Sequence, residues 1–229
     1  MIINWGDAPF KAFITVTYPS GTCTVTGEGQ SYTHTGGGTT TFTVKKKGSY
    51  AVNSTATNAT AGSSVSIAEA GQTANVTLKY ELILFNGGQT VPWIANGSYN
   101  SAGSSIHVTA NANEACCVST SSKIDLTHYK TLYITVARAY CRGTHSWNYI
   151  RAGVSDNSSA GSTGGSAGNF TKYVQICGPG GSFSSAKTFS LDISAYGAKH
   201  VKIATEANNY GVTSSFDSDG TITKVWVTS

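Results

Sequence analysis

Apolar and polar residues alternate along much of this chain, with the period of two that is typical of half-buried β-strands. Between Leu132 and Val136, apolar side chains at every second position alternate with Tyr133 and Thr135. A longer alternating run covers residues 75–84. These runs predict strands that each turn one face toward a core and the other face toward solvent, and hence an all-β protein.

Two similar turns precede strands in the second half of the chain. One reads Ile-Asp-Leu-Thr-His-Tyr and contains Asp125, and the other reads Leu-Asp-Ile-Ser-Ala-Tyr and contains Asp192. An aspartate at such a position commonly accepts hydrogen bonds from the backbone N–H groups of its own turn. We therefore expect both aspartates to stabilise turns, rather than to form the carboxylate pair of a glycosidase. The repeated turn implies a sandwich whose sheets are joined by similar corners.

Turns rich in Gly, Pro and Ser divide the chain into an arm and two β domains. Residues 1–10 form the arm, residues 11–84 a first antiparallel sandwich, and residues 85–229 a larger second one. The strands of the second domain are expected at 93–94, 106–108, 117–124, 132–136, 149–154, 173–177, 189–193, 201–204 and 223–227. This series of strands suits a jelly-roll sandwich.

The first domain resembles PEGA-like and immunoglobulin-like modules. The similarity rests on three strings: Ile-Thr-Val-Thr-Tyr-Pro-Ser-Gly (14–21), Thr-Phe-Thr-Val-Lys-Lys-Lys-Gly-Ser-Tyr-Ala-Val (41–52) and Gly-Gln-Thr-Ala-Asn-Val-Thr-Leu (71–78). Such modules recur in tail and other virion proteins of phages and prophages, and in bacterial surface proteins. The Cys…Trp…Cys set of antibody domains is absent here.

The second domain, with its two aspartate turns, is similar to galactose-binding-like and other carbohydrate-binding jelly rolls, and to terminal modules of phage fibres. The similarity is one of layout, so no ligand-binding residue is implied by it. Residues 156–169 are almost wholly Gly, Ser, Ala, Asn and Thr, a composition that predicts a mobile loop or hairpin connection.

The composition limits the classes of partner. Charged residues make up only 11% of the chain, against about 25% in an average protein, and the net charge is +4. No basic stripe suited to a phosphate backbone is present, which argues against nucleic-acid binding. The run Lys45-Lys46-Lys47 reads as a solvated hairpin tip. No segment approaches the roughly 18 apolar residues of a membrane span.

The N-terminal residues and the cysteines both favour folding in a cytoplasm. The first ten residues lack the basic and apolar regions of a signal peptide. Five cysteines, at 23, 116, 117, 141 and 177, form no regular disulfide framework and are expected as buried thiols. The alternative is a zinc site in which Cys141 and His145 join Cys116 or Cys117.

Three groups of residues are candidates for binding. Trp147, Tyr149 and Arg151 would share one face of a strand, where two rings and a guanidinium could contact a glycan, and the alternative is packing in the core or a subunit interface. Asp217 and Asp219 lie in an acidic stretch that either forms a plain turn or binds calcium.

The third group, Trp5 and Phe10, would make residues 1–10 an assembly arm that docks on the chain's own domain or on a neighbouring subunit. Catalytic motifs and cofactor fingerprints are missing, so we expect no enzyme activity and no cofactor other than calcium.

The leading interpretation is a non-enzymatic structural and adhesion protein of a phage or prophage particle, such as a tail, baseplate or appendage. It would be assembled in the host cytoplasm with other virion proteins and copies of itself. The first domain would attach to the particle, and the second would face outward and contact a host glycan. The alternative is a glycan-binding module of a bacterial surface or secreted protein.

Overall fold

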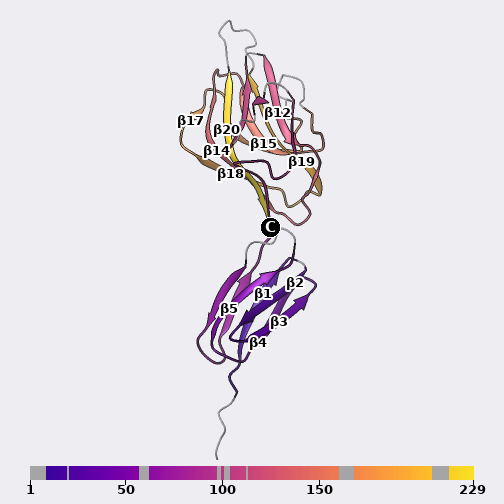
Figure 1. Cartoon of the computed structure of the whole chain (residues 1–229). Helices are drawn as coiled ribbons and strands as arrows, with labels where there is room; N and C mark the ends of the chain where they lie inside the picture. Colours follow the sequence, from indigo (N-terminus) through magenta and orange to yellow (C-terminus); the bar gives the residue numbers. More distant parts are fainter. Residues whose placement is uncertain are drawn as a thin grey trace, which may run out of the picture. The chain divides into compact units, whose positions relative to one another are not determined.

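The computed structural model describes residues 9–19, 21–56, 62–96, 99–100, 104–111, 113–159, 168–207 and 217–229. Every secondary-structure element assigned in these residues is a β-strand. The chain divides into two compact units, Met1–Glu81 and Leu82–Ser229 (Figure 1). The all-β fold expected from the sequence is confirmed. No helix with the length and apolar character needed to cross a membrane occurs in the described ranges.

The first unit is a sandwich of two sheets. The three-stranded sheet has the order β4 (Gly38–Val44), β1 (Ala12–Tyr18), β7 (Thr73–Thr77), with β1 and β7 parallel. The four-stranded sheet has the order β3 (Gln30–Thr35), β2 (Thr22–Gly27), β5 (Gly48–Ser54), β6 (Ser63–Ile67). Alternation sets the core: Ile14 and Val16 are fully buried, whereas Thr15 faces outward and its hydroxyl lies 3.0 Å from that of Thr41.

The sequence predicts a hairpin tip at residues 45–47 and an arm at residues 1–10 in this unit. Residues 45–47 join β4 to β5, which belong to different sheets, so the predicted hairpin is wrong. The chain crosses between sheets here because Val44 and Tyr50 enter the same core from opposite sides. Of the expected arm, Phe10 packs partly buried against this core, and Trp5 lies outside the described residues.

The second unit is a larger sandwich. Its seven-stranded sheet runs β10 (Tyr99–Asn100), β11 (Ile106–Ala110), β20 (Ser218–Thr228), β14 (Thr131–Cys141), β17 (Ser182–Phe183), with β18 (Lys187–Asp192) also on β14 and β8 (Glu81–Asn86) on β20. Its six-stranded sheet runs β16 (Lys172–Cys177), β15 (Tyr149–Ser155), β19 (Ala198–Ala207), β12 (Glu114–Thr120), β9 (Trp93–Asn96), with β13 (Ile124–Asp125) also on β19.

The run at 75–84, expected as one strand, is divided. β7 ends at Thr77, and a separate strand, β8, begins at Glu81 and pairs with β20 of the second unit. Leu84 and Phe85 are both buried. Alternation alone cannot show such a break, because it records which residues are buried and not which core receives them.

The two aspartate turns have the same hydrogen bonds. Asp125 Oδ1 accepts from the backbone N–H of Thr127 at 3.0 Å and from its hydroxyl at 2.5 Å. Asp192 Oδ1 accepts from the N–H and hydroxyl of Ser194 at 3.0 and 2.7 Å. The turn-stabilising role predicted for both aspartates is confirmed.

An apolar side chain follows each of these aspartates and anchors its turn. Leu126 and Ile193 are both fully buried. The carbonyl of each then accepts a hydrogen bond from the tyrosine three residues later, at 2.9 Å for Tyr129 and 3.0 Å for Tyr196. The Ile193 N–H also donates to the carbonyl of Lys130 at 2.7 Å, so the second turn is tied to the segment that follows the first.

All five cysteines are buried free thiols. Burial raises the pKa of Cys116 to about 11. Cys141 lies in the core, whereas His145 packs on Trp147 with ring centroids 4.8 Å apart. In the part of the chain that the structure describes, no group of three potential ligands is placed to hold a metal ion. The burial of all five thiols confirms the expectation of buried cysteines.

We expect the aspartate turns to make folding sensitive to acid. The hydrogen bonds from Thr127 and Ser194 lower the pKa of Asp125 and of Asp192, so their contribution is present at neutral pH and is lost as the pH falls through these lowered values. The variant Asp125→Asn/Asp192→Asn keeps an acceptor oxygen but cannot titrate. Its melting temperature should fall less than that of the wild type between about pH 5 and pH 2.

Glu69→Gln/Glu81→Gln removes two charges elsewhere and is the control. An unchanged acid dependence in the double asparagine variant would contradict the prediction.

We also expect Cys116 to resist alkylation in the folded protein. With a pKa of about 11, its thiolate fraction at pH 8 is smaller than that of a free thiol of pKa about 8.5 by a factor of roughly 200. Iodoacetamide labelling followed by peptide mass spectrometry should give a rate at least about 100-fold lower in buffer than in urea. Similar rates in the two conditions would show that this thiol is accessible.

Candidate functional site

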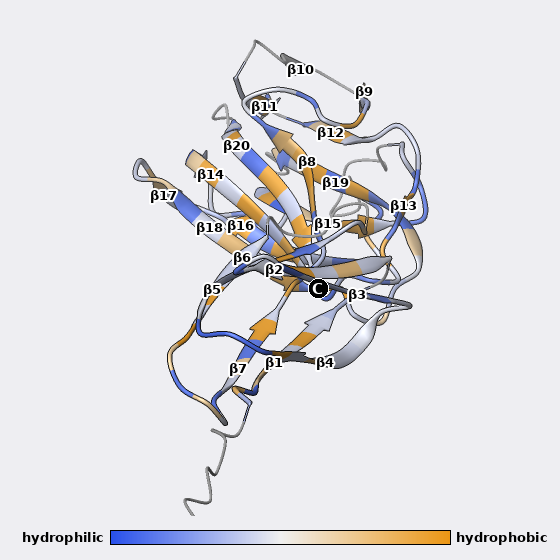
Figure 2. Ribbon diagram, turned by 60° about the horizontal axis from the view of Figure 1, so that its bottom comes forward, coloured by the Kyte–Doolittle hydropathy of each residue, from blue (hydrophilic) through white to orange (hydrophobic). Residues whose placement is uncertain are grey.

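The outward face of the seven-stranded sheet is shaped by two bulges where β14 pairs with β20. Thr135 pairs with Lys224, Val136 with Ile222, and Arg138 with Thr221, so Thr223 and Ala137 are each one extra residue. Each bulge shifts the alternation of its strand by one position. Odd-numbered residues of β14 face outward before the bulge, and even-numbered residues face outward after it. Figure 2 shows the alternation as stripes along both strands.

Beyond the bulges, outward side chains form a polar network that we call the Tyr140 site. Arg138 and Tyr140 lie in β14, and Arg142 follows directly after it. Asp219 lies in β20, Asp217 directly precedes that strand, and His107 belongs to β11. The shift places Tyr140 directly across from Asp219, and the backbone N–H of Arg142 extends the pairing by donating to the Asp217 carbonyl at 2.8 Å.

The charges of the Tyr140 site alternate and are paired. The Tyr140 hydroxyl donates to Asp217 at 3.0 Å, and Arg142 Nε lies 3.3 Å from the same carboxylate. Asp219 lies 2.6 Å from His107 Nε2 and 3.6 Å from Arg138. Burial, followed by the hydrogen bond to Asp217, raises the pKa of Tyr140, so its hydroxyl remains a donor at neutral pH. The network thus fixes the tyrosine ring at the centre of the site.

Two shallow hollows, each of about 390 Å³, are lined in part by Tyr140. They share Tyr140 and Ser182. One is completed mainly by Arg142 and the glycines at 143, 180 and 181, and the other by Arg138, Phe183 and Ser184. Arg138 and Arg142 keep 57% and 69% of their side chains exposed. The lining of each hollow therefore includes Tyr140, an exposed arginine and a serine.

A stacked aromatic pair lies on the same face, before the bulges. The rings of Tyr133 and Trp226 have centroids 5.0 Å apart and planes inclined by 14°. The Lys224 ammonium lies 4.3 Å from the Trp226 centroid. From Tyr133 to Tyr140, β14 rises by about 20 Å at roughly 3.3 Å per residue. Rings and polar groups therefore follow one another along this strand.

The structure does not support calcium at Asp217 and Asp219. The turn expected from 217 to 220 is wrong, because β20 begins at Ser218 and pairs on both sides, with β11 and with β14. Strand pairing overrides the local preference for a turn. Each carboxylate faces an arginine, and Asp219 also faces His107. The arginine side chains thus lie beside the carboxylates, where a calcium ion would need additional oxygen ligands.

The three residues predicted to share a strand face are placed differently. Trp147 lies in the turn before β15 and packs on His145. Tyr149 and Arg151 do share the outward face of β15, but Tyr149 is buried, and its hydroxyl donates to Glu206 at 2.9 Å. Arg151 contacts the Tyr149 ring and also the ring of Tyr173 on the neighbouring strand β16.

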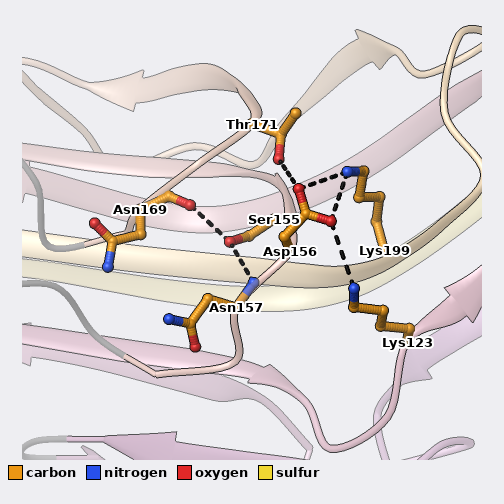
Figure 3. Close-up of polar contacts among 7 residues, drawn as sticks. All are labelled: Lys123, Ser155, Asp156, Asn157, Asn169, Thr171 and Lys199. Carbon is orange, nitrogen blue, oxygen red and sulfur yellow. Dashed lines mark hydrogen bonds and ion pairs between the residues drawn. The ribbon is translucent and has the colours of Figure 1, made fainter.

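The segment after β15 covers part of the six-stranded sheet. Asp156 binds Lys199 at 2.7 Å and Lys123 at 3.5 Å, and the Ser155 hydroxyl donates to the Asn169 carbonyl at 2.6 Å (Figure 3). These contacts fix both ends of the predicted loop at 156–169, whose residues 160–167 lie outside the described ranges.

Beneath this segment lies a buried lysine. The Lys202 ammonium donates to the Ser159 carbonyl at 2.6 Å, and burial lowers its pKa. The Ser119 hydroxyl donates to the Ser158 carbonyl at 2.9 Å. The outward face of β12 and β19 is therefore a covered polar layer, unlike the open face of β14 and β20.

Sequence reasoning missed the Tyr140 site. Arg138, Tyr140 and Arg142 do alternate at i, i+2 and i+4, and this signal was present. The partners Asp217 and His107 lie far away in sequence, and only the pairing of β11, β20 and β14 brings them beside Tyr140.

No family model and no curated protein sequence matches this chain. Among solved structures, it is similar to the family 11 carbohydrate-binding module from Clostridium thermocellum in complex with a β-1,3-1,4-mixed-linked tetrasaccharide, with 12% identity and a TM-score of 0.38, over 64% of this chain and 94% of that one. It is also similar to the secreted serine protease VesC from Vibrio cholerae, with 9% identity and a TM-score of 0.37, over 96% of this chain and 47% of that one. The chain is an all-β protein whose fold is distantly similar to carbohydrate-binding β-sandwich modules, and the likeness concerns the fold alone.

Proposed function

We propose that the protein binds a neutral glycan on the outward face of β14 and β20, with Tyr140 at the centre of the site. The observation that carries this proposal is the pair of hollows that share Tyr140 and Ser182 in their lining. Their size lies within the range of small-ligand pockets, about 300–1,000 Å³. The sequence-based alternative, a glycan-binding module, is thus the function that the geometry supports best.

The chemistry of the Tyr140 site suits sugar hydroxyl groups. A sugar presents apolar C–H faces, which pack on aromatic rings, and hydroxyls, which both donate and accept hydrogen bonds. Arginine carries five N–H donors, and the contacts of Arg138 and Arg142 with the aspartates use only part of them. Since the carboxylates are already paired with cations, the site has no unbalanced charge that would favour an ion over a polyol.

The position of the aromatic pair favours an extended ligand. Tyr133 and Trp226 lie along the same strand pair as Tyr140, so a polysaccharide following β14 would meet both groups. The pair is partly exposed, which leaves ring surface for stacking. We expect longer oligosaccharides to bind more tightly than single sugars for this reason.

Membership of a phage particle, attachment through the first unit and the absence of enzyme activity stay sequence-based predictions. The solved structures named above are carbohydrate-binding and protease chains, and none of them bears on assembly in a virion. A glycan-binding site would serve a virion protein and a bacterial surface protein equally well.

The proposal predicts that Tyr140→Ala weakens binding to neutral polysaccharides by at least about tenfold, the effect of losing roughly 1.4 kcal/mol of contact. Affinity electrophoresis with mixed-linked glucan, xylan, mannan and galactan would select the ligand, and calorimetry would measure the affinity. Tyr140→Phe keeps the ring and loses only the bond to Asp217, so it should bind more tightly than Tyr140→Ala.

Tyr196→Ala is the matched control, because it removes a partly exposed tyrosine of the same unit that lines neither hollow. It should bind neutral polysaccharides like the wild type. The proposal fails if the wild type binds none of the four polymers, or if Tyr140→Ala binds as tightly as the control.

A further inference from the structure

Arg151 lies on the outward face of the six-stranded sheet, in contact with two tyrosine rings. Its guanidinium carbon is 3.7 Å from the centroid of Tyr149 and 4.4 Å from that of Tyr173. Tyr149 precedes Arg151 by two positions in β15, and Tyr173 belongs to the adjacent strand β16. Contacts of this kind hold a planar guanidinium in a fixed orientation.

The guanidinium retains unused hydrogen-bond donors. Among the described residues, no hydrogen bond or ion pair reaches it, and Arg151 Nε is buried without a partner. Buried donors without partners are rare in native proteins, because leaving one unpaired costs free energy. The nearest acidic side chain of the neighbouring strand, Glu206, is fully buried and instead accepts from the Tyr149 hydroxyl at 2.9 Å.

The surroundings of Arg151 are open toward β16. Tyr173 is 44% exposed, and its ring is supported by Phe170, with centroids 5.6 Å apart. Directly across from Tyr173 stands Gly153, which has no side chain to cover the ring. Gln175, which pairs with Arg151 across the two strands, is exposed.

We propose that Arg151 binds the carboxylate of a uronate residue in an acidic polysaccharide, with the sugar ring against Tyr173. The two parallel N–H groups of arginine match the two oxygens of a carboxylate, and such charge-assisted bonds are stronger than neutral ones. The exposed Tyr173 ring provides a surface for the apolar face of the sugar. This site is independent of the Tyr140 site, since it lies on the other sheet and selects charge.

Nuclear magnetic resonance of the wild-type protein tests the proposal directly. The Arg151 Nε–H signal, assigned by its loss in Arg151→Lys, should shift on addition of millimolar galacturonate and not on addition of galactose. Inorganic sulfate serves as a second anion. The absence of a shift with galacturonate, an equal shift with galactose, or a shift with sulfate alone would overturn the proposal.

Affinity for polygalacturonate provides the second measurement. Arg151→Gln and Arg151→Lys should both lose at least about tenfold, because lysine keeps the charge but not the paired donors. Tyr140→Ala should retain wild-type affinity for this polymer, which separates failure here from failure of the neutral site. Melting temperatures would confirm that each variant is folded. Wild-type affinity in a folded Arg151→Lys variant would show that charge alone suffices and would refute the site.

Discussion

The pairing of β14 with β20 determines which side chains of the second unit reach its surface. The two strands remain in register over most of their length, yet each contains one extra residue near the middle. The extra residues cancel in register but reverse the alternation of both strands. Val136 and Ala139 are therefore both buried, although three positions separate them, and Tyr140 faces outward together with Tyr133. The hydrophobic core fixes this arrangement, because any other shift would expose apolar residues on one side of the bulge.

The two sheets of the second unit use their outward faces in different ways. The face of β14 and β20 is open, and its charged residues pair with one another around Tyr140. The face of β12 and β19 is covered by the segment after β15, and its lysine is bound to a backbone carbonyl. Arg151, near the edge of this covered face, has a buried Nε–H without a hydrogen-bond partner among the described residues. The two proposed sites, one neutral and one selective for anions, rest on this difference.

Several features could be predicted from single residues and their neighbours. The aspartate turns were correct because each carboxylate accepts its hydrogen bonds from a residue only two positions away, as Asp125 and Thr127 show. Strands of the second unit lie at or near the predicted positions, although β14 and β19 are longer than expected. The turn at 217–220 was wrong because pairing with two neighbouring strands outweighs the preference of Asp and Gly for turns.

By itself, the sequence determined the all-β fold, the buried alternating positions and the two repeated turns, since these depend on short-range patterns and on burial. Only the tertiary structure decided which residues meet. It moved Trp147 into a turn, buried Tyr149, joined Arg151 to Tyr173, and brought His107 and Asp219 together across 112 positions. The physical reason is that a strand's pattern specifies which face is apolar, whereas its neighbours and its bulges, which specify what lies beside each polar side chain, depend on the packing of the whole sandwich.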